Sequence, residues 1–295
     1  MVASGIPLIN ANFQIPTRRN EVAYRYPIVT APKDQRMTSD LLHIEHQGAI
    51  LRVTLNRPEK RNALSRELLT AIRDTFTEKS GDDSLKIATL TGSGERSFAA
   101  GGDLRDLESV RTLAEAQKMA EETKDALNTL RHFPVPVVAM LNGDAMGGGA
   151  ELAMACDFRV AAHHVRFGFV QGRLNITSAW GGGVDLIRRV GPDRALGILC
   201  RAEMMTGTEA MALGVVDSLA GPEESLPEAL EAFIAPFLLQ SPQVLRGFKA
   251  MVDGARQGLP RHALDKLETK VFAPTWVHED HWTAAAKVLA GKGSS

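Results

Sequence analysis

Three consecutive glycines between two apolar segments constrain the fold of this chain more than any other feature. Gly147, Gly148 and Gly149 follow the β-branched run at residues 135–141 and precede a stretch rich in helix formers at residues 150–156. The first run predicts a buried strand and the second a helix. Glycines at such a junction let a substrate approach the backbone, and the first amides of a helix are partly positive. The junction is therefore either an oxyanion site or a tight turn between two crossing backbones.

A second glycine turn occurs earlier in the chain and favours the first interpretation. Residues 86–90 form another apolar run typical of a buried strand, and Gly101 and Gly102 precede a helical pattern at residues 104–131. Two such turns can face each other and donate one backbone amide each to the same carbonyl oxygen. Alternating strands and helices of this kind also predict parallel strands joined by crossover helices.

The two glycine motifs resemble the signatures of a known superfamily. F-A-A-G-G-D-L at residues 98–104 and G-D-A-M-G-G-G-A-E-L at residues 143–152 are similar to the paired motifs of the crotonase (enoyl-CoA hydratase/isomerase) superfamily. The resemblance implies an α/β fold, a spiral of ββα units, and an enzyme that binds acyl-CoA thioesters. It also implies that the amides of Gly102 and Gly148 hold the thioester oxygen, with Ala100 beside the substrate.

The acid and base residues distinguish reactions within this superfamily. Glu151 matches the first catalytic glutamate of enoyl-CoA hydratases, but the position of the second is occupied by Gln171, which cannot act as a general base. Decarboxylation of a malonyl-type thioester needs only enolate stabilisation and a proton donor. With S-A-W-G-G at residues 178–182, the pattern resembles the ethylmalonyl-CoA decarboxylases. We therefore expect a lyase that decarboxylates ethylmalonyl-CoA or methylmalonyl-CoA.

Two other functions stay open. The chain could be a 2-enoyl-CoA hydratase or isomerase of fatty-acid or amino-acid degradation that uses Glu151 alone. It could also be a non-catalytic binding member of the superfamily, for which the cluster Arg57, Lys60 and Arg61 is the main support. A net charge of −1, from 34 basic and 35 acidic residues, argues against nucleic acid as a partner.

Further substrate contacts are predicted in two places. The loop N-R-P-E-K-R-N-A-L at residues 56–64 resembles the segment of crotonases beside the nucleotide of coenzyme A. Lys60 and Arg61 are candidates to bind its phosphates, or they are solvated surface charges. Trp180 either shapes the acyl pocket or fills core beside the glycines. Coenzyme A is part of the substrate, and we expect no separate cofactor.

The chain divides into three predicted regions. Residues 1–36 carry four prolines and few periodic apolar positions, which indicates a poorly ordered arm; an organelle-targeting peptide and a start at Met37 are alternatives. Residues 37–225 form the predicted crotonase core. Residues 226–295 read as helices whose apolar stripes have little to cover within one subunit, and the resemblance implies a homotrimer or homohexamer.

Composition limits the remaining possibilities. No apolar run approaches the ~20 residues that span a bilayer, so we expect a soluble cytoplasmic protein without a membrane partner. Cys156 and Cys200 both lie in apolar helical contexts and are expected in the core. His163 and His164 are adjacent, but no third ligand stands at a suitable spacing, so we predict a polar loop and no metal site.

Overall fold

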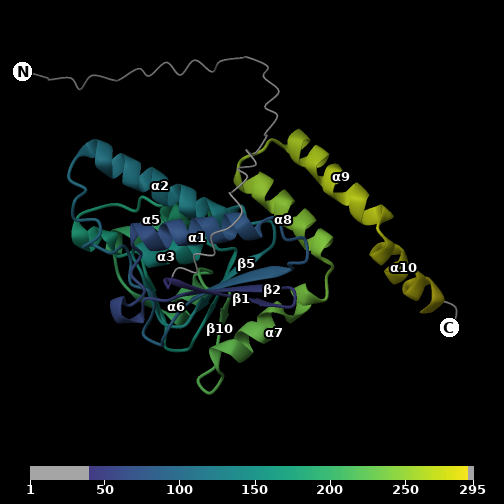
Figure 1. Cartoon of the computed structure of the whole chain (residues 1–295), viewed down its shortest axis with the longest axis horizontal. Helices are drawn as coiled ribbons and strands as arrows, with labels where there is room; N and C mark the ends of the chain where they lie inside the picture. Colours follow the sequence, from purple (N-terminus) through teal and green to yellow (C-terminus); the bar gives the residue numbers. More distant parts are fainter. Residues whose placement is uncertain (1–39, 292–295) are drawn as a thin grey trace, which may run out of the picture. The chain divides into compact units, whose positions relative to one another are not determined.

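The computed structural model describes residues 40–291. These residues belong to one compact unit of the chain, Thr38–Ser295. The predicted arm at residues 1–36 lies outside the described residues, and so do the alternatives proposed for it. Figure 1 shows the fold of residues 40–291 in colour.

A six-stranded sheet runs through the centre of this unit. Its first two strands pair as an antiparallel hairpin, and all the other neighbours are parallel, as the alternation of strands and helices predicts. Strands β3 and β5, in the middle of the sheet, are buried along nearly their whole length, as strands of a parallel sheet covered on both faces usually are. In spatial order the strands are β1 (Leu42–Gln47), β2 (Ile50–Leu55), β3 (Ile87–Gly92), β5 (Val137–Leu141), β7 (Phe158–Ala161) and β10 (Ser218–Leu219).

A smaller sheet of four short strands carries the two glycine turns. Its order is β4 (Ser97–Ala99), β6 (Asp144–Met146), β8 (Arg166–Gly168) and β9 (Met205–Thr206), and its first three strands are parallel. Strands β4 and β6 each end directly before a glycine turn. Because the carboxyl ends of parallel neighbours meet at one edge of a sheet, this pairing brings the two turns together.

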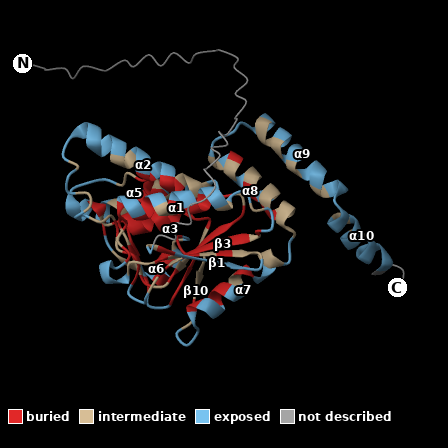
Figure 2. Ribbon diagram, in the orientation of Figure 1, coloured by how far each residue is buried: buried red, intermediate tan, exposed pale blue. Residues whose placement is uncertain are grey.

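Helices cover the sheets, and the figures show which of them pack on the core (Figures 1 and 2). Helix α7 packs on β7, where Phe233 and Phe237 make edge contacts with Phe158. Helices α9 and α10, by contrast, are exposed along most of their length. The helices and short 3-10 turns are η1 (Pro58–Lys60), α1 (Arg66–Lys79), α2 (Leu113–Arg131), α3 (Gly148–Ala155), η2 (Gln171–Leu174), α4 (Gly182–Val190), α5 (Pro192–Arg201), α6 (Gly207–Ala212), α7 (Leu226–Leu238), α8 (Pro242–Arg256), α9 (Arg261–Val277) and α10 (Glu279–Gly291).

Two expectations from the sequence are wrong. The helix predicted over residues 104–131 begins only at Leu113, because Thr112 and Glu115 form a capping box that starts the helix there. Cys156 is buried as expected, whereas Cys200 is exposed on α5. No helix within residues 40–291 combines the length and apolar character needed to cross a membrane.

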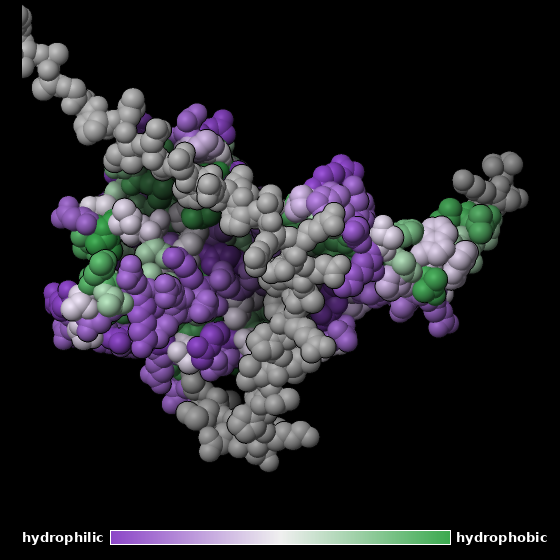
Figure 3. All heavy atoms as spheres, turned by 90° about the horizontal axis from the view of Figure 1, so that it is seen from above, coloured by the Kyte–Doolittle hydropathy of each residue, from purple (hydrophilic) through white to green (hydrophobic). Residues whose placement is uncertain are grey.

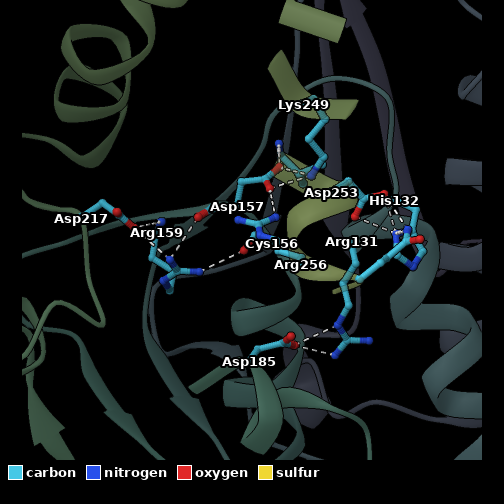
Figure 4. A network of polar contacts seen from close by, with 12 residues as sticks. Arg131, His132, Cys156, Asp157, Arg159, Asp185, Asp217, Lys249, Asp253 and Arg256 are labelled. Carbon is cyan, nitrogen blue, oxygen red and sulfur yellow. Dashed lines mark hydrogen bonds and ion pairs between the residues drawn. The ribbon is translucent and has the colours of Figure 1, made fainter. Parts of the chain in front are cut away.

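A buried ion cluster fastens α8 to the end of the central sheet. The carboxylate of Asp157 lies 2.6 Å from the Lys249 ammonium and 2.6 Å from the Arg256 guanidinium, and it accepts a hydrogen bond from the Val137 amide at 2.9 Å. Figure 4 shows Asp157 between these two cations. Asp157 and Lys249 are only 5% and 6% exposed, so each charge depends on the other for compensation.

We expect Asp157→Asn to destabilise the protein by about 3 to 5 kcal/mol, because it leaves Lys249 buried with a neutral partner. Equilibrium unfolding in urea would measure the loss. The control is Asp83→Asn: this side chain is 93% exposed, lies 3.6 Å from Arg246 and should contribute little. Equal stability of the two variants would contradict the role assigned to the cluster.

Candidate active site

The loop before α1 is anchored to the segment that precedes the first glycine turn. Asn62 is completely buried, and its side-chain amide donates hydrogen bonds to the carbonyl oxygens of Ser93 at 3.1 Å and Ser97 at 2.8 Å. Its φ of 54° lies in the left-handed region, which asparagine tolerates better than most residues. Asn62 therefore joins the loop to both ends of the segment between β3 and β4.

Backbone hydrogen bonds then fix the turn itself. The Leu64 amide donates to Gly101 O at 2.8 Å, and the Asp103 amide donates to Leu64 O at 2.9 Å. The Ala100 amide is also used, since it donates to Arg61 O at 3.1 Å. Gly102 lies between these bonded positions, and its own amide is not part of this ladder.

The second glycine turn faces the first. Gly147 has a φ of 56°, which suits glycine, and α3 begins at Gly148, whose amide has no acceptor within its own helix. A Cβ atom placed on Gly101 would lie 3.2 Å from Met146 O and 3.6 Å from Gly148 N, so the two backbones nearly touch. Within residues 40–291, neither the Gly102 amide nor the Gly148 amide donates a hydrogen bond. Two free donors therefore lie in adjoining turns.

The indole of Trp180 packs against both of these glycines. A Cβ on Gly148 would come within 2.1 Å of the indole atom Cζ3, and one on Gly102 would lie 3.1 Å from Cη2. Trp180 itself is only 6% exposed. Gly149 is short of space for another reason: its Cβ would lie 2.0 Å from Ala99 O, because α3 rests directly on β4. The glycine run is thus required by packing as well as by conformation.

Glu151 is buried and fully engaged in hydrogen bonds. Its carboxyl group accepts a hydrogen bond from the side-chain amide of Gln171 at 2.9 Å. It also accepts hydrogen bonds from the backbone amides of Trp180 at 2.8 Å and Gly182 at 3.0 Å. A longer contact of 3.4 Å reaches the amide of Ala179. Burial raises the pKa of the Glu151 carboxyl above its ordinary value, while the four hydrogen bonds act in the opposite direction.

The structure therefore brings five of the predicted site residues together: Gly102, Gly148, Glu151, Gln171 and Trp180. Ala100 adjoins them in the first turn, where its amide is bonded to Arg61 O. The Arg61 side chain lines a separate cavity of about 540 Å³ with Arg96 and Arg166, beside the beginnings of β4 and β6. Lys60 is exposed at the end of η1. A phosphate-binding role for Lys60 and Arg61 stays a prediction.

Sequence reasoning missed three contributors to this arrangement. Arg57 forms an ion pair at 2.9 Å with Asp103, which follows the first glycine turn. The backbone amides of Trp180 and Gly182 bind Glu151. Arg131 donates a hydrogen bond to Trp180 O at 3.0 Å. The glycines after Trp180 predict that another part of the chain packs closely against this backbone. The sequence does not show that the side chains of Glu151 and Arg131 are the groups that do so.

Other reactive groups lie near the site without a geometry for chemistry. Cys156, at the end of α3, is buried, and burial raises the pKa of its thiol to about 12, so it is protonated at neutral pH. In the described part of the chain, no three histidine, cysteine or acidic side chains are grouped so that they could hold a metal ion.

Comparison with known proteins identifies the family of the chain. A family model for enoyl-CoA hydratase/isomerase matches residues 45–287. The crotonyl-CoA hydratase of Syntrophomonas wolfei subsp. wolfei is 35% identical over 192 residues, which are 65% of this chain and 74% of that protein. The ethylmalonyl-CoA decarboxylase of Xenopus tropicalis is 28% identical over 230 residues, which are 78% of this chain and 76% of that protein.

Solved structures confirm the fold. An enoyl-CoA hydratase subunit from Geobacillus kaustophilus HTA426 superposes with a TM-score of 0.76 at 30% sequence identity, covering 85% of this chain and 95% of that one. The α/β crotonase fold predicted from the glycine motifs is thereby confirmed. From its sequence, its fold and the two facing glycine turns, the chain belongs to the enoyl-CoA hydratase/isomerase family, within the crotonase superfamily of acyl-CoA enzymes.

Proposed function

We propose that this enzyme is an acyl-CoA lyase that decarboxylates a short branched malonyl-CoA, such as ethylmalonyl-CoA or methylmalonyl-CoA. One observation carries the proposal. The buried carboxyl group of Glu151 is hydrogen-bonded to the amide of Gln171 at 2.9 Å, where a hydratase has a second carboxylate. The site therefore has one acid and no partner base to activate water.

The proposed reaction begins with cleavage of the bond between the α-carbon and the carboxylate. The electron pair of that bond moves into the thioester and gives an enolate, and CO2 leaves. The amides of Gly102 and Gly148 hold the enolate oxygen, and each such donor contributes ~3 kcal/mol in a dry site. Protonated Glu151 then gives its proton to the α-carbon and regains one from solvent. These steps use no cofactor besides the coenzyme A of the substrate.

The surroundings of Glu151 suit a proton donor. Burial favours the neutral acid, so a larger fraction of Glu151 is protonated near neutral pH than of an exposed glutamate. The hydrogen bonds from Trp180 and Gly182 hold the carboxyl group in one orientation. The indole of Trp180, packed against both glycines, limits the space for an acyl chain and for water, which supports a short substrate.

Hydration of a 2-enoyl-CoA is the second candidate function. Its support is the higher identity to the crotonyl-CoA hydratase, 35%, than to the ethylmalonyl-CoA decarboxylase, 28%. In that reaction Glu151 would act without a second carboxylate. Measured activities, rather than sequence identity, distinguish the two because the decisive difference lies at a single position, Gln171.

The first test follows CO2 release from ethylmalonyl-CoA and methylmalonyl-CoA. We expect turnover of at least one of them, and a loss of about 10²- to 10⁴-fold in kcat for Glu151→Gln, which cannot donate a proton to the enolate. Glu121→Gln, on the exposed face of α2, serves as the control and should keep full activity. Absence of CO2 release from both substrates would exclude the decarboxylase.

A gain-of-function variant tests the incomplete acid and base pair. Gln171→Glu places a second carboxyl group within hydrogen-bond distance of Glu151, so that the pair shares one proton and supplies a base for water. We expect hydration of crotonyl-CoA, followed by loss of the enoyl-thioester absorbance, to rise about 100-fold. Gln171→Met removes the same amide without adding a base and should not hydrate. If the unaltered enzyme already hydrates crotonyl-CoA as fast as Gln171→Glu does, the second candidate function is favoured.

We further propose that the enzyme functions as a homotrimer, or as a hexamer of two trimers. Helix α9 has no buried residue, and it carries large exposed apolar side chains together with α10. Figure 3 shows hydrophobic residues gathered at the right of the view, where α10 lies. Such surfaces are covered by a partner in most proteins. The exposed apolar residues are Phe272, Trp276, Val277, Trp282, Val288 and Leu289.

Sedimentation equilibrium would test this assembly. The native protein should have three or six times the mass of one chain. Replacing Phe272 and Trp282 together by serine removes apolar contact area and should shift the population toward smaller species. Leu113→Ser, at the exposed start of α2, is the matched control and should leave the mass unchanged. A monomeric native protein would exclude the assembly.

A further inference from the structure

We infer that Arg131, the last residue of α2, positions Glu151 by fixing the turn whose amides bind its carboxyl group. The effect on catalysis rests on the proposed function of Glu151, whereas the positioning itself does not. Arg131 contacts none of the reacting groups of the proposed reaction. It therefore acts on Glu151 through the turn at residues 179–182. The contacts on the two sides of that turn carry the inference.

On one side of the turn, each of the three guanidinium nitrogens of Arg131 donates a hydrogen bond. Its Nε donates to the Asp185 carboxylate at 2.8 Å, its Nη2 donates to Trp180 O at 3.0 Å, and its Nη1 donates to the Asn128 side chain at 3.0 Å. Figure 4 shows the pair of contacts between Arg131 and Asp185. Both side chains of this ion pair are less than one fifth exposed, which limits screening by water.

On the other side, the same turn binds Glu151. The amides of Trp180 and Gly182 both donate to Oε2, at 2.8 Å and 3.0 Å. Trp180 thus accepts from Arg131 through its carbonyl group and donates to Glu151 through its amide. A shift of this residue away from Arg131 would alter the hydrogen bond to the carboxyl group directly.

Gly181 shows how closely the guanidinium packs on the turn. Its φ of 92° is left-handed, and a Cβ placed on it would lie 2.7 Å from Arg131 Nη2. A Cβ on Gly182 would lie 2.4 Å from the Cα of Glu151. The turn is therefore a thin layer of backbone between Arg131 and Glu151, and it has little freedom as long as both side chains are present.

The chemistry of arginine suits this position. A planar guanidinium can donate to a carbonyl oxygen and to a carboxylate at the same time, which the single ammonium group of lysine does less well. Among the described residues, the charged side chains that hydrogen-bond to the turn are Arg131 from α2 and Glu151 from α3, and Asp185 of α4 is paired with Arg131. Removing Arg131 would free the turn and leave Asp185 without its partner.

A cavity makes the inference testable by chemical rescue. Arg131 and Gly181 line a cavity of about 500 Å³, which also has Lys124, Arg188 and Arg256 in its walls. This volume is large enough to admit a small guanidinium compound. In Arg131→Ala, methylguanidinium entering from the cavity can restore the contacts with Trp180 O and Asp185, whereas neutral methylurea cannot restore the ion pair.

The experiment measures the Glu151 carboxyl group and the reaction separately. Isotope-edited infrared titration, with Glu151→Gln to assign the band, follows ionisation of Glu151 even in an inactive protein. We expect Arg131→Ala to raise the pKa of Glu151, because its amide donors lose their fixed orientation, and to lower kcat about 10- to 100-fold with little change in KM. Methylguanidinium should reverse both changes.

Arg246→Ala is the matched control. Arg246 lies on α8, donates to the Asp82 carbonyl and pairs with the Asp83 carboxylate, and it is not among the residues that line the cavity beside Arg131. It should leave the titration of Glu151 and kcat unchanged. If Arg131→Ala does not fold, Arg131→Lys replaces it, and a smaller shift in the same direction is expected because lysine keeps the charge but not both contacts.

Two outcomes separate this inference from the proposed function. An unchanged titration of Glu151 in folded Arg131→Ala or Arg131→Lys overturns the positioning role, whether or not the enzyme releases CO2. A raised pKa that methylguanidinium reverses, in a protein inactive toward malonyl-type thioesters, supports the positioning role and rejects the decarboxylase.

Discussion

The close approach of backbones at the glycine turns is the constraint on which the rest of this structure depends. Gly149 has no space for a side chain because α3 rests on β4, and Gly148 has none because the indole of Trp180 lies against it. This packing places the first turn of α3 beside Gly102. Two amides that donate no hydrogen bond within residues 40–291 then lie in adjoining turns, an arrangement that can hold an oxyanion.

The position of Glu151 follows from the same packing. One turn into α3, its side chain reaches the start of α4, where backbone amides point out of the helix and carry partial positive charge. Burial favours the neutral acid and these amides favour the carboxylate, so the ionisation of Glu151 reflects a balance between two opposing effects. We infer that Arg131 fixes these amides, and it thereby favours the carboxylate form of Glu151.

Much of this could be predicted from the sequence because the decisive signals are local. Apolar runs next to glycines predicted β3, β5 and the start of α3. The start of α2 was predicted too early, since the capping residues Thr112 and Glu115 lie inside a longer helical pattern. The expectation that Cys200 lies in the core was wrong because a sequence can show that a helix is apolar without showing which of its faces is covered.

The sequence by itself determined the class of fold, the two glycine turns and the identity of the groups at the site, because glycine, glutamate and glutamine have properties that need no partner to be recognised. Only the tertiary structure decided that Trp180 lies against both turns and that Arg131 and Glu151 contact opposite sides of one backbone segment. These contacts join residues from α2, α3 and α4. Their geometry depends on how the helices pack, and packing is a property of the whole chain rather than of any local pattern.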